Sequence, residues 1–291
     1  MIQHLVISGG GPNFIAHLGI FQECIDRGIL DVGNVKSVHA TSAGTVPAMM
    51  LAMHIPISEV VDYFIERPWD KWMKIDAMIF DMKCLCDSES LREAVRPFFD
   101  AYDVPISITF AQFYERFGVD LHFFVTTLDT MESVDCCRET KPDMAVTDAA
   151  VISSSIPPIY RPMLYEGRYY FDGGFTNNFP VAVCVQKHDP SEVLAVGNTY
   201  DNIKPDFEAA SAFKILSHIT EIFSKNANPL KENAEAAAKC KYCVTYLARG
   251  IMSPSLWEQF LLSNESRKSL FDDGRECAIA YFKKINEVEH C

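Results

Sequence analysis

One serine in this 291-residue chain stands in a stretch that could present a nucleophile. A run rich in β-branched residues, 35–41, leads into the small residues 42–44, and a helix-forming run, 46–53, follows. A tight turn between a strand and a helix exposes the hydroxyl of its serine at the positive end of the helix. Ala40 replaces the first glycine of the usual G-x-S-x-G pattern. Ser42 is therefore the candidate nucleophile for attack on an ester.

A carboxylate that could act as the base stands far downstream, in Phe171-Asp172-Gly173-Gly174. An aspartate at the end of a strand, followed by two glycines, can be held rigidly with its carboxylate aimed into a pocket. From there Asp172 would take the proton of Ser42 and return it to the leaving group. An Asp-Gly pair is also a strong signal for a hairpin turn, which is the structural alternative at this position.

Three consecutive glycines, Gly9, Gly10 and Gly11, follow the apolar run 4–8 and precede an expected helix over 14–25. Backbone amides exposed between a strand and a helix can meet the alkoxide that forms when a serine attacks an ester. A dinucleotide-binding loop is disfavoured, because Phe14 occupies the position of its third glycine and Pro12 has no N–H for a phosphate. A plain structural turn remains the alternative.

Histidines and cysteines offer two further alternatives. A Ser-His-Asp triad would need a histidine after the acid, and the histidines in that order are His188, His218 and His290. Cys240 and Cys243 have the spacing of a metal-ligand pair, but a four-ligand zinc site needs a second matched pair. The other close cysteines are Cys84 with Cys86 and the adjacent Cys136 and Cys137. We expect no metal and no cofactor at the site.

The elements that must position these residues alternate between strands and helices. Strands are expected over 4–8, 35–41, 121–128, 169–171, 193–198 and 242–247, with 133–137 as the hairpin partner of 121–128. Helices are expected over 14–25, 46–53, 58–66, 89–99, 109–117, 145–152, 208–223, 255–262 and 276–285. The 109–117 helix has a capping box, with Thr109 three residues ahead of Gln112. The first four elements in chain order, 4–8, 14–25, 35–41 and 46–53, alternate as strand, helix, strand and helix, which is the order of a parallel α/β sheet.

Bulk properties limit the class of protein. Hydrophobic residues make up 48% of the chain, which is enough for a substantial core, and the net charge of −13 disfavours nucleic acid as a partner. No apolar run is long enough to span a bilayer, and no secretory signal is visible. The 10 cysteines form no disulfide-type framework, which is typical of a reducing compartment. We expect a cytoplasmic protein that contacts membranes transiently at their surface.

Residues 67–86 gather tryptophans and methionines among charges, and they have two interpretations. They could cover the site as a bilayer-facing lid, or they could pack as the interior of a secondary layer. The second is favoured, because aromatic and methionine side chains are mostly interior.

In this order, the glycine triplet, the serine elbow and the Asp-Gly-Gly motif resemble the patatin-like phospholipase family. The Ser/Ala-rich segment ending in prolines, 152–162, and the Asn178-Phe179-Pro180 run are similar as well, so the resemblance covers about residues 1–200. It implies a three-layer α/β fold with a central parallel or mixed sheet, and a Ser42–Asp172 dyad that cleaves lipid acyl esters through an acyl-enzyme. It also implies that the amides of Gly9, Gly10 and Gly11 form the oxyanion hole.

The expected organisation is a catalytic core over 1–200, with a helical insertion near 58–117, and C-terminal helices and the last strand of the same domain over 201–291. Two alternative functions remain open. One is a lipid-binding or scaffold protein that keeps the fold without the reaction, because Ala40 departs from the motif and no lysine or arginine follows Gly11. The other is a hydrolase or acyltransferase for soluble esters. The oligomeric state is not fixed by the sequence.

Overall fold

A computed structural model describes residues 1–71, 89–157, 160–200, 222–223, 227–248 and 254–289 of the chain. Eight strands form one mixed sheet in the order β5-β6-β3-β2-β1-β7-β8, with β4 paired to β3. Their bounds are β1 His4–Ile7, β2 Ser37–Thr41, β3 Asp120–Thr127, β4 Ser133–Cys136, β5 Met163–Tyr165, β6 Arg168–Asp172, β7 Val193–Tyr200 and β8 Tyr242–Ala248. The β3-β2-β1-β7-β8 part is parallel, and β4, β5 and β6 are added in antiparallel fashion.

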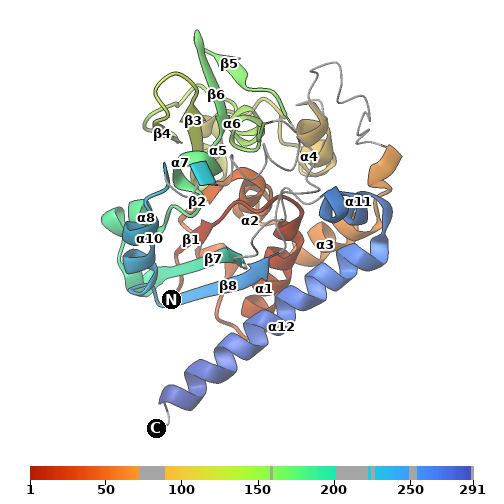
Figure 1. Cartoon of the computed structure of the whole chain (residues 1–291), viewed down its shortest axis with the longest axis vertical. Coiled ribbons are helices and arrows are strands. Elements are labelled where there is room, and N and C mark those ends of the chain that lie inside the picture. Colours follow the sequence, from red (N-terminus) through yellow and green to blue (C-terminus); the bar gives the residue numbers. More distant parts are fainter. Residues whose placement is uncertain (72–88, 158–159, 201–221, 224–226, 249–253, 290–291) are drawn as a thin grey trace, which may run out of the picture.

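Helices cover both faces of this sheet (Figure 1). The described helices are α1 Phe14–Asp26, α2 Thr45–Ala52, α3 Ile57–Glu66, α4 Glu89–Ala101, α5 Phe110–Phe117, α6 Val146–Ser153, α7 Gly174–Asn177, α8 Val181–Lys187, α10 Leu230–Ala237, α11 Pro254–Leu262 and α12 Asn264–Glu289. The long helix α12 lies along α1 and also reaches α3 and β8. α8 packs on α10 at the other side of β1.

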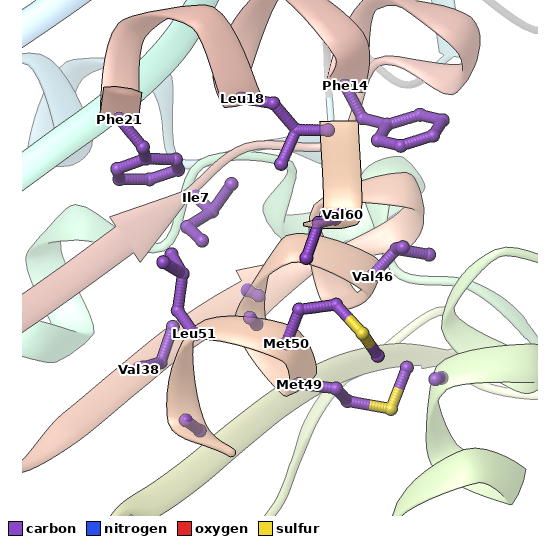
Figure 2. Close-up of a cluster of buried hydrophobic side chains, with 14 of the residues drawn as sticks. Ile7, Phe14, Leu18, Phe21, Val38, Val46, Met49, Met50, Leu51 and Val60 are labelled. Atoms are coloured by element: carbon purple, nitrogen blue, oxygen red, sulfur yellow. The ribbon is translucent and has the colours of Figure 1, made fainter. Parts of the chain in front are cut away.

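Both faces of the central strand β1 are buried because helices cover each of them. Along β1, Leu5 and Ile7 belong to the large cluster under α1, α2 and α3, whereas Val6 belongs to a smaller cluster under α8 and α10. This alternation follows from the two-residue period of a strand, which turns successive side chains to opposite faces. Figure 2 shows the larger cluster, in which Ile7 and Val38 of the sheet meet the side chains of α1, α2 and α3. The expected three-layer α/β fold with a mixed sheet is confirmed.

Two strand ends meet on β3. β2 ends at Thr41, which is paired with Phe124, and β6 ends at Asp172, which is paired with the next residue, Val125. The residue after Thr41 is Ser42. The pairing of β2 and β6 with β3 therefore places the two candidate catalytic residues, Ser42 and Asp172, next to each other beside β3.

Most expected elements lie within a few residues of the observed ones. The 133–137 run is the antiparallel hairpin partner of β3, and Thr109 and Gln112 form the capping box in both directions. β5, α7, α8 and α10 are absent from the elements expected above, and α12 begins a dozen residues before the expected start at 276. The 208–223 helix falls almost wholly outside the described residues, as does most of 67–86. Across the described ranges, no helix is both long and apolar enough to span a membrane.

Candidate active site

Ser42 lies at a sharp turn between β2 and α2. A 3₁₀ turn, Ser42–Gly44, links the two elements, and Ser42 has a φ of 53°, which is unusual for a residue with a side chain. The turn packs tightly on the end of β1, because a Cβ added to Gly44 would come within 2.6 Å of the carbonyl oxygen of Ser8. Only glycine fits at this approach. The strained serine is thus held by the close packing of its neighbours.

The hydroxyl of Ser42 donates a hydrogen bond of 2.7 Å to Oδ2 of Asp172, across 130 positions of sequence. Both residues are buried, with exposed fractions of 4% and 2%. Ala40 does not displace the serine from this contact, although it takes the place of a glycine; its side chain is fully buried beside β1. The nucleophile and base expected from the sequence therefore lie at hydrogen-bonding distance.

Asp172 is held at the end of β6 by its other oxygen. Oδ1 accepts a 2.7 Å hydrogen bond from the backbone N–H of Gly174, which opens α7. The hairpin-turn alternative at Asp172 is wrong, because a short helix follows β6 directly. Burial away from water raises the pKa of the Asp172 carboxyl from 3.8 to about 7, although the bonds from Ser42 and Gly174 oppose this rise. A carboxyl that titrates near neutral pH is matched to general-base catalysis.

The three glycines lie beside Ser42, and their amides differ in what they contact. The N–H of Gly9 donates to the carbonyl of Asn178, and a Cβ at Gly9 would be 2.8 Å from Cβ of Ser42. Within the described chain, no loop or side-chain hydrogen bond uses the N–H of Gly10 or of Gly11. Gly11 opens a 3₁₀ turn, Gly11–Asn13, that leads into α1. The amides of Gly10 and Gly11 are accordingly the ones with free donor capacity.

Side chains behind the loop fix its carbonyls. Asn198 of β7 donates from Nδ2 to the carbonyl of Gly9 at 3.0 Å, and its Oδ1 lies 3.1 Å from Nε2 of the fully buried His17. Asn13 donates to the carbonyl of Gly10 at 2.8 Å. A peptide group whose C=O is held on one side turns its N–H to the other, so these contacts orient the loop amides. Asn198 could not be expected from the sequence, because nothing local marks a single asparagine in a strand.

Ser153 ties the serine turn to β3. Its hydroxyl accepts a 2.8 Å hydrogen bond from the N–H of Ser42 and donates one of 2.6 Å to the carbonyl of Phe124. Thr126 adds a second tie, since its hydroxyl donates to the carbonyl of Asp172 at 2.9 Å. The Ser-rich segment after α6 was noted as a motif, but its role in holding Ser42 was not expected.

An apolar cavity of about 80 Å³ opens beside Ser42. Its walls come from the glycine loop and the start of α1, from the serine turn and α2, from α3 and the turn after it, from α4, from the segment after α6 and from α11. The side chains that line it are Pro12, Phe14, Ala43, Val46, Phe64, Trp69, Leu91, Ala94, Ile156, Tyr160, Trp257 and Phe260. Trp69 is buried and stacks on Phe64 at 5.4 Å between ring centroids. Of the described residues 67–71, Trp69 is buried in the cavity wall, whereas Pro68, Asp70 and Lys71 are exposed, and residues 72–86 lie outside the described ranges. The apolar walls suit a hydrocarbon chain.

The alternative sites are placed elsewhere or fall outside the described residues. His188 stacks on His4 at 3.7 Å between ring centroids, and its Nε2 lies 3.4 Å from the hydroxyl of Ser37. His218 and His290 lie outside the described residues, and so do Cys84 and Cys86. Burial raises the pKa of Cys240 to about 12 and that of Cys243 to about 11, so both thiols stay protonated.

The structure thus combines a serine strained at a strand–helix turn, a buried aspartate that accepts its hydrogen bond and a three-layer α/β fold. The profile of the patatin-like phospholipase family matches residues 5–185. The chain therefore belongs to the patatin-like phospholipase family, as the resemblance implied.

Relatives extend this similarity. "Uncharacterized protein R571" of Acanthamoeba polyphaga mimivirus is 26% identical over 205 residues, which cover 69% of this chain and 67% of the relative. "Probable lipid hydrolase 463L" of Invertebrate iridescent virus 6 is 24% identical over 238 residues, which cover 77% and 80%. The crystal structure of VipD from Legionella pneumophila is similar with a TM-score of 0.58 and 14% identity over 96% of this chain and 67% of that one. The family supports lipid hydrolysis as the general activity.

Proposed function

We propose that the protein hydrolyses carboxylic esters of lipids, with Ser42 as nucleophile and Asp172 as general base. The observation that carries the proposal is the 2.7 Å hydrogen bond between Ser42 Oγ and Asp172 Oδ2 at the wall of an apolar cavity. The acyl chain would lie along the apolar walls, which brings the ester carbonyl next to Ser42.

The reaction would run in two steps. Asp172 takes the hydroxyl proton as Ser42 attacks the carbonyl carbon, and the alkoxide of the tetrahedral intermediate accepts hydrogen bonds from the amides of Gly10 and Gly11. The proton then passes from Asp172 to the departing alcohol, which leaves an acyl-enzyme. In the second step Asp172 activates a water molecule in the same way, and the fatty acid leaves.

Burial of the base makes this chemistry plausible without a histidine. An aspartate with an ordinary pKa would be too weak a base for a serine hydroxyl. At Asp172 burial raises the pKa of the carboxyl to about 7, so the ionised form holds a proton more strongly than an exposed carboxylate does.

The glycine loop supports an ester substrate more than a particular headgroup. Pro12 and Phe14 after the triplet line the apolar cavity, and the side chain of Asn13 is engaged with the carbonyl of Gly10. This loop therefore offers no cation to a phosphate, and we propose an ester selected by its acyl chain.

Fluorophosphonate labelling tests the proposal directly, because the probe reacts with an activated serine. We expect labelling of Ser42 by peptide mapping, with turnover of a medium-chain p-nitrophenyl ester. Both should be lost in Ser42→Ala, whereas Ser133→Ala, at an exposed position of β4, should retain them.

Two outcomes would replace the proposal. Intact lipid that co-purifies with a protein showing neither labelling nor ester turnover would favour a binding or scaffold role. Acyl transfer to an added alcohol in preference to water would favour a transferase with the same dyad.

A further inference from the structure

A cluster of possible metal ligands lies on the face of the sheet that α8 covers, away from the apolar cavity. It consists of His122 on β3, Asp135 on β4 and Cys137 just after β4. One ligand atom from each residue lies within 4.8 Å of the other two. None of the three takes part in the proposed ester hydrolysis.

The strand register explains why the three side chains meet. β3 and β4 pair Phe123 with Cys136 and Phe124 with Asp135, so His122 comes opposite Cys137 when the pairing is continued by one residue. Side chains of residues opposite one another share a face of the sheet, and so do those two positions away. His122, Cys137 and Asp135 therefore lie on one face, while Cys136 points to the other face and joins the large core cluster.

The donor set matches a zinc-class cation. A thiolate, an imidazole and a carboxylate are the three ligand types that Zn²⁺ uses, at about 2.0–2.3 Å from the ion. Tetrahedral geometry with these bond lengths separates ligand atoms by ~3.3–3.8 Å. A pair at the 4.8 Å limit would have to approach by about 1.0–1.5 Å, and Asp135 Oδ2, which lies 2.9 Å from Nδ1 of His122, would have to move away by about 0.4 Å or more. Cys137 and His122 are buried, with exposed fractions of 0% and 2%, and the half-buried Asp135 gives the ion a route from solvent.

A second observation points to the same place. His39 of β2 is fully buried, and within the described residues neither of its ring nitrogens has a hydrogen-bond partner. Its ring stacks on that of His122 with centroids 4.2 Å apart and an angle of 9° between planes. Buried polar groups normally have hydrogen-bond partners. A buried imidazole with no partner for either nitrogen, next to three possible metal ligands, therefore indicates that a polar group or ion is missing from this part of the interior.

Two of the three side chains already touch one another, because Oδ2 of Asp135 lies 2.9 Å from Nδ1 of His122. The fold therefore holds these ligand groups together without a cation.

We propose that His122, Asp135 and Cys137 bind one Zn²⁺-class divalent cation. The ion replaces the protons that these groups hold, and they pass to solvent. It would fasten the β3–β4 hairpin. β3 carries Phe124 and Thr126, which bond to Ser153 and Asp172, so the ion would act as a structural support for the strand behind the dyad.

The test uses the full chain without an affinity tag, stripped by chelator and dialysed against micromolar Zn²⁺ or Co²⁺. We expect one equivalent of Zn²⁺ by elemental analysis. With Co²⁺ we expect a thiolate-to-metal charge-transfer band in the near ultraviolet. Cys137→Ala should lose the band and weaken Zn²⁺ binding at least tenfold, whereas Cys136→Ala, the adjacent and equally buried cysteine, should keep both.

Retention of the Co²⁺ band in Cys137→Ala, or absence of bound Zn²⁺ in the wild-type chain, would overturn the proposal. Circular dichroism without metal reports whether each variant folds. If Cys137→Ala does not fold, Asp135→Ala at the half-buried ligand takes its place, and unchanged Zn²⁺ affinity in that variant would equally overturn the site.

Discussion

The substitution Asp172→Asn tests two expected consequences of the buried carboxyl, its action as a base and its effect on stability as the pH changes. The amide has nearly the shape of the carboxyl but can neither accept the proton of Ser42 as a base nor titrate. We expect ester turnover to fall by about 10²–10⁴-fold, which is the usual contribution of a general base. We also expect the protein to become less sensitive to pH, for a reason that can be worked from the pKa of Asp172.

In the folded protein burial raises the pKa of the Asp172 carboxyl from 3.8 to about 7. A raised pKa stabilises the fold fully below the ordinary value of the group, and this contribution is lost as the pH rises through the folded value. Between about pH 5 and pH 8 the wild-type chain should therefore lose about 3 kcal/mol of free energy of unfolding through this one group. The Asp172→Asn protein has no carboxyl to titrate at this position. Its free energy of unfolding, relative to that of wild type, should therefore rise by the same amount between these two pH values.

Urea unfolding of both proteins at these two pH values measures this change in relative free energy of unfolding. The other titrating groups are the same in both proteins, so their contributions cancel in the comparison. The wild-type pH–rate profile gives an independent check. Only the ionised carboxyl is a base, so kcat/KM should fall about tenfold from its plateau by about one pH unit below the pKa. A difference in stability that does not change with pH, together with turnover that is flat from about pH 6 to pH 8, would refute the reasoning.

Three further perturbations test the parts of the site. Asn198→Ala removes the donor to the carbonyl of Gly9, and kcat should fall about tenfold with little change in KM; an effect on KM alone would contradict an orienting role. Val46→Phe fills part of the cavity and should shift the preferred ester toward shorter acyl chains in a series of p-nitrophenyl esters, whereas an unchanged preference would place the acyl chain elsewhere. Thr109→Ala removes the cap of α5 and should lower the free energy of unfolding by about 1 kcal/mol with turnover unchanged, as measured by thermal melting and steady-state kinetics.

Most of the fold could be predicted from local sequence patterns. The run from β1 to α2 could be predicted because its apolar residues, glycines and small residues mark strand, turn and helix within a few positions. The short helices α7 and α8 could not, because an Asp-Gly-Gly sequence is equally good for a hairpin, and only the packing of Gly173 against the carbonyl of Phe124 decides between them.

The candidate site divides in the same way. Ser42 and Asp172 stand in motifs, and the sequence was sufficient to expect that they meet. Ser153 lies at the end of α6 and Asn198 lies on β7, both far along the chain from the residues they contact, so their bonds to the serine turn and the glycine loop depend on tertiary structure. The same holds for His122, which meets Cys137 only because β4 folds back on β3.

Because two strand ends meet on β3, the elements that position Ser42 and Asp172 differ from the elements that line the cavity. The spacing of the hydroxyl and the carboxylate is fixed by main-chain pairing at Phe124 and Val125. The cavity, by contrast, takes Phe64, Trp69 and Leu91 from helices and a turn that contribute no strand to the sheet. Under the proposed function, insertions, deletions or exchanges in that covering layer would change which acyl groups fit while Ser42 and Asp172 keep their positions.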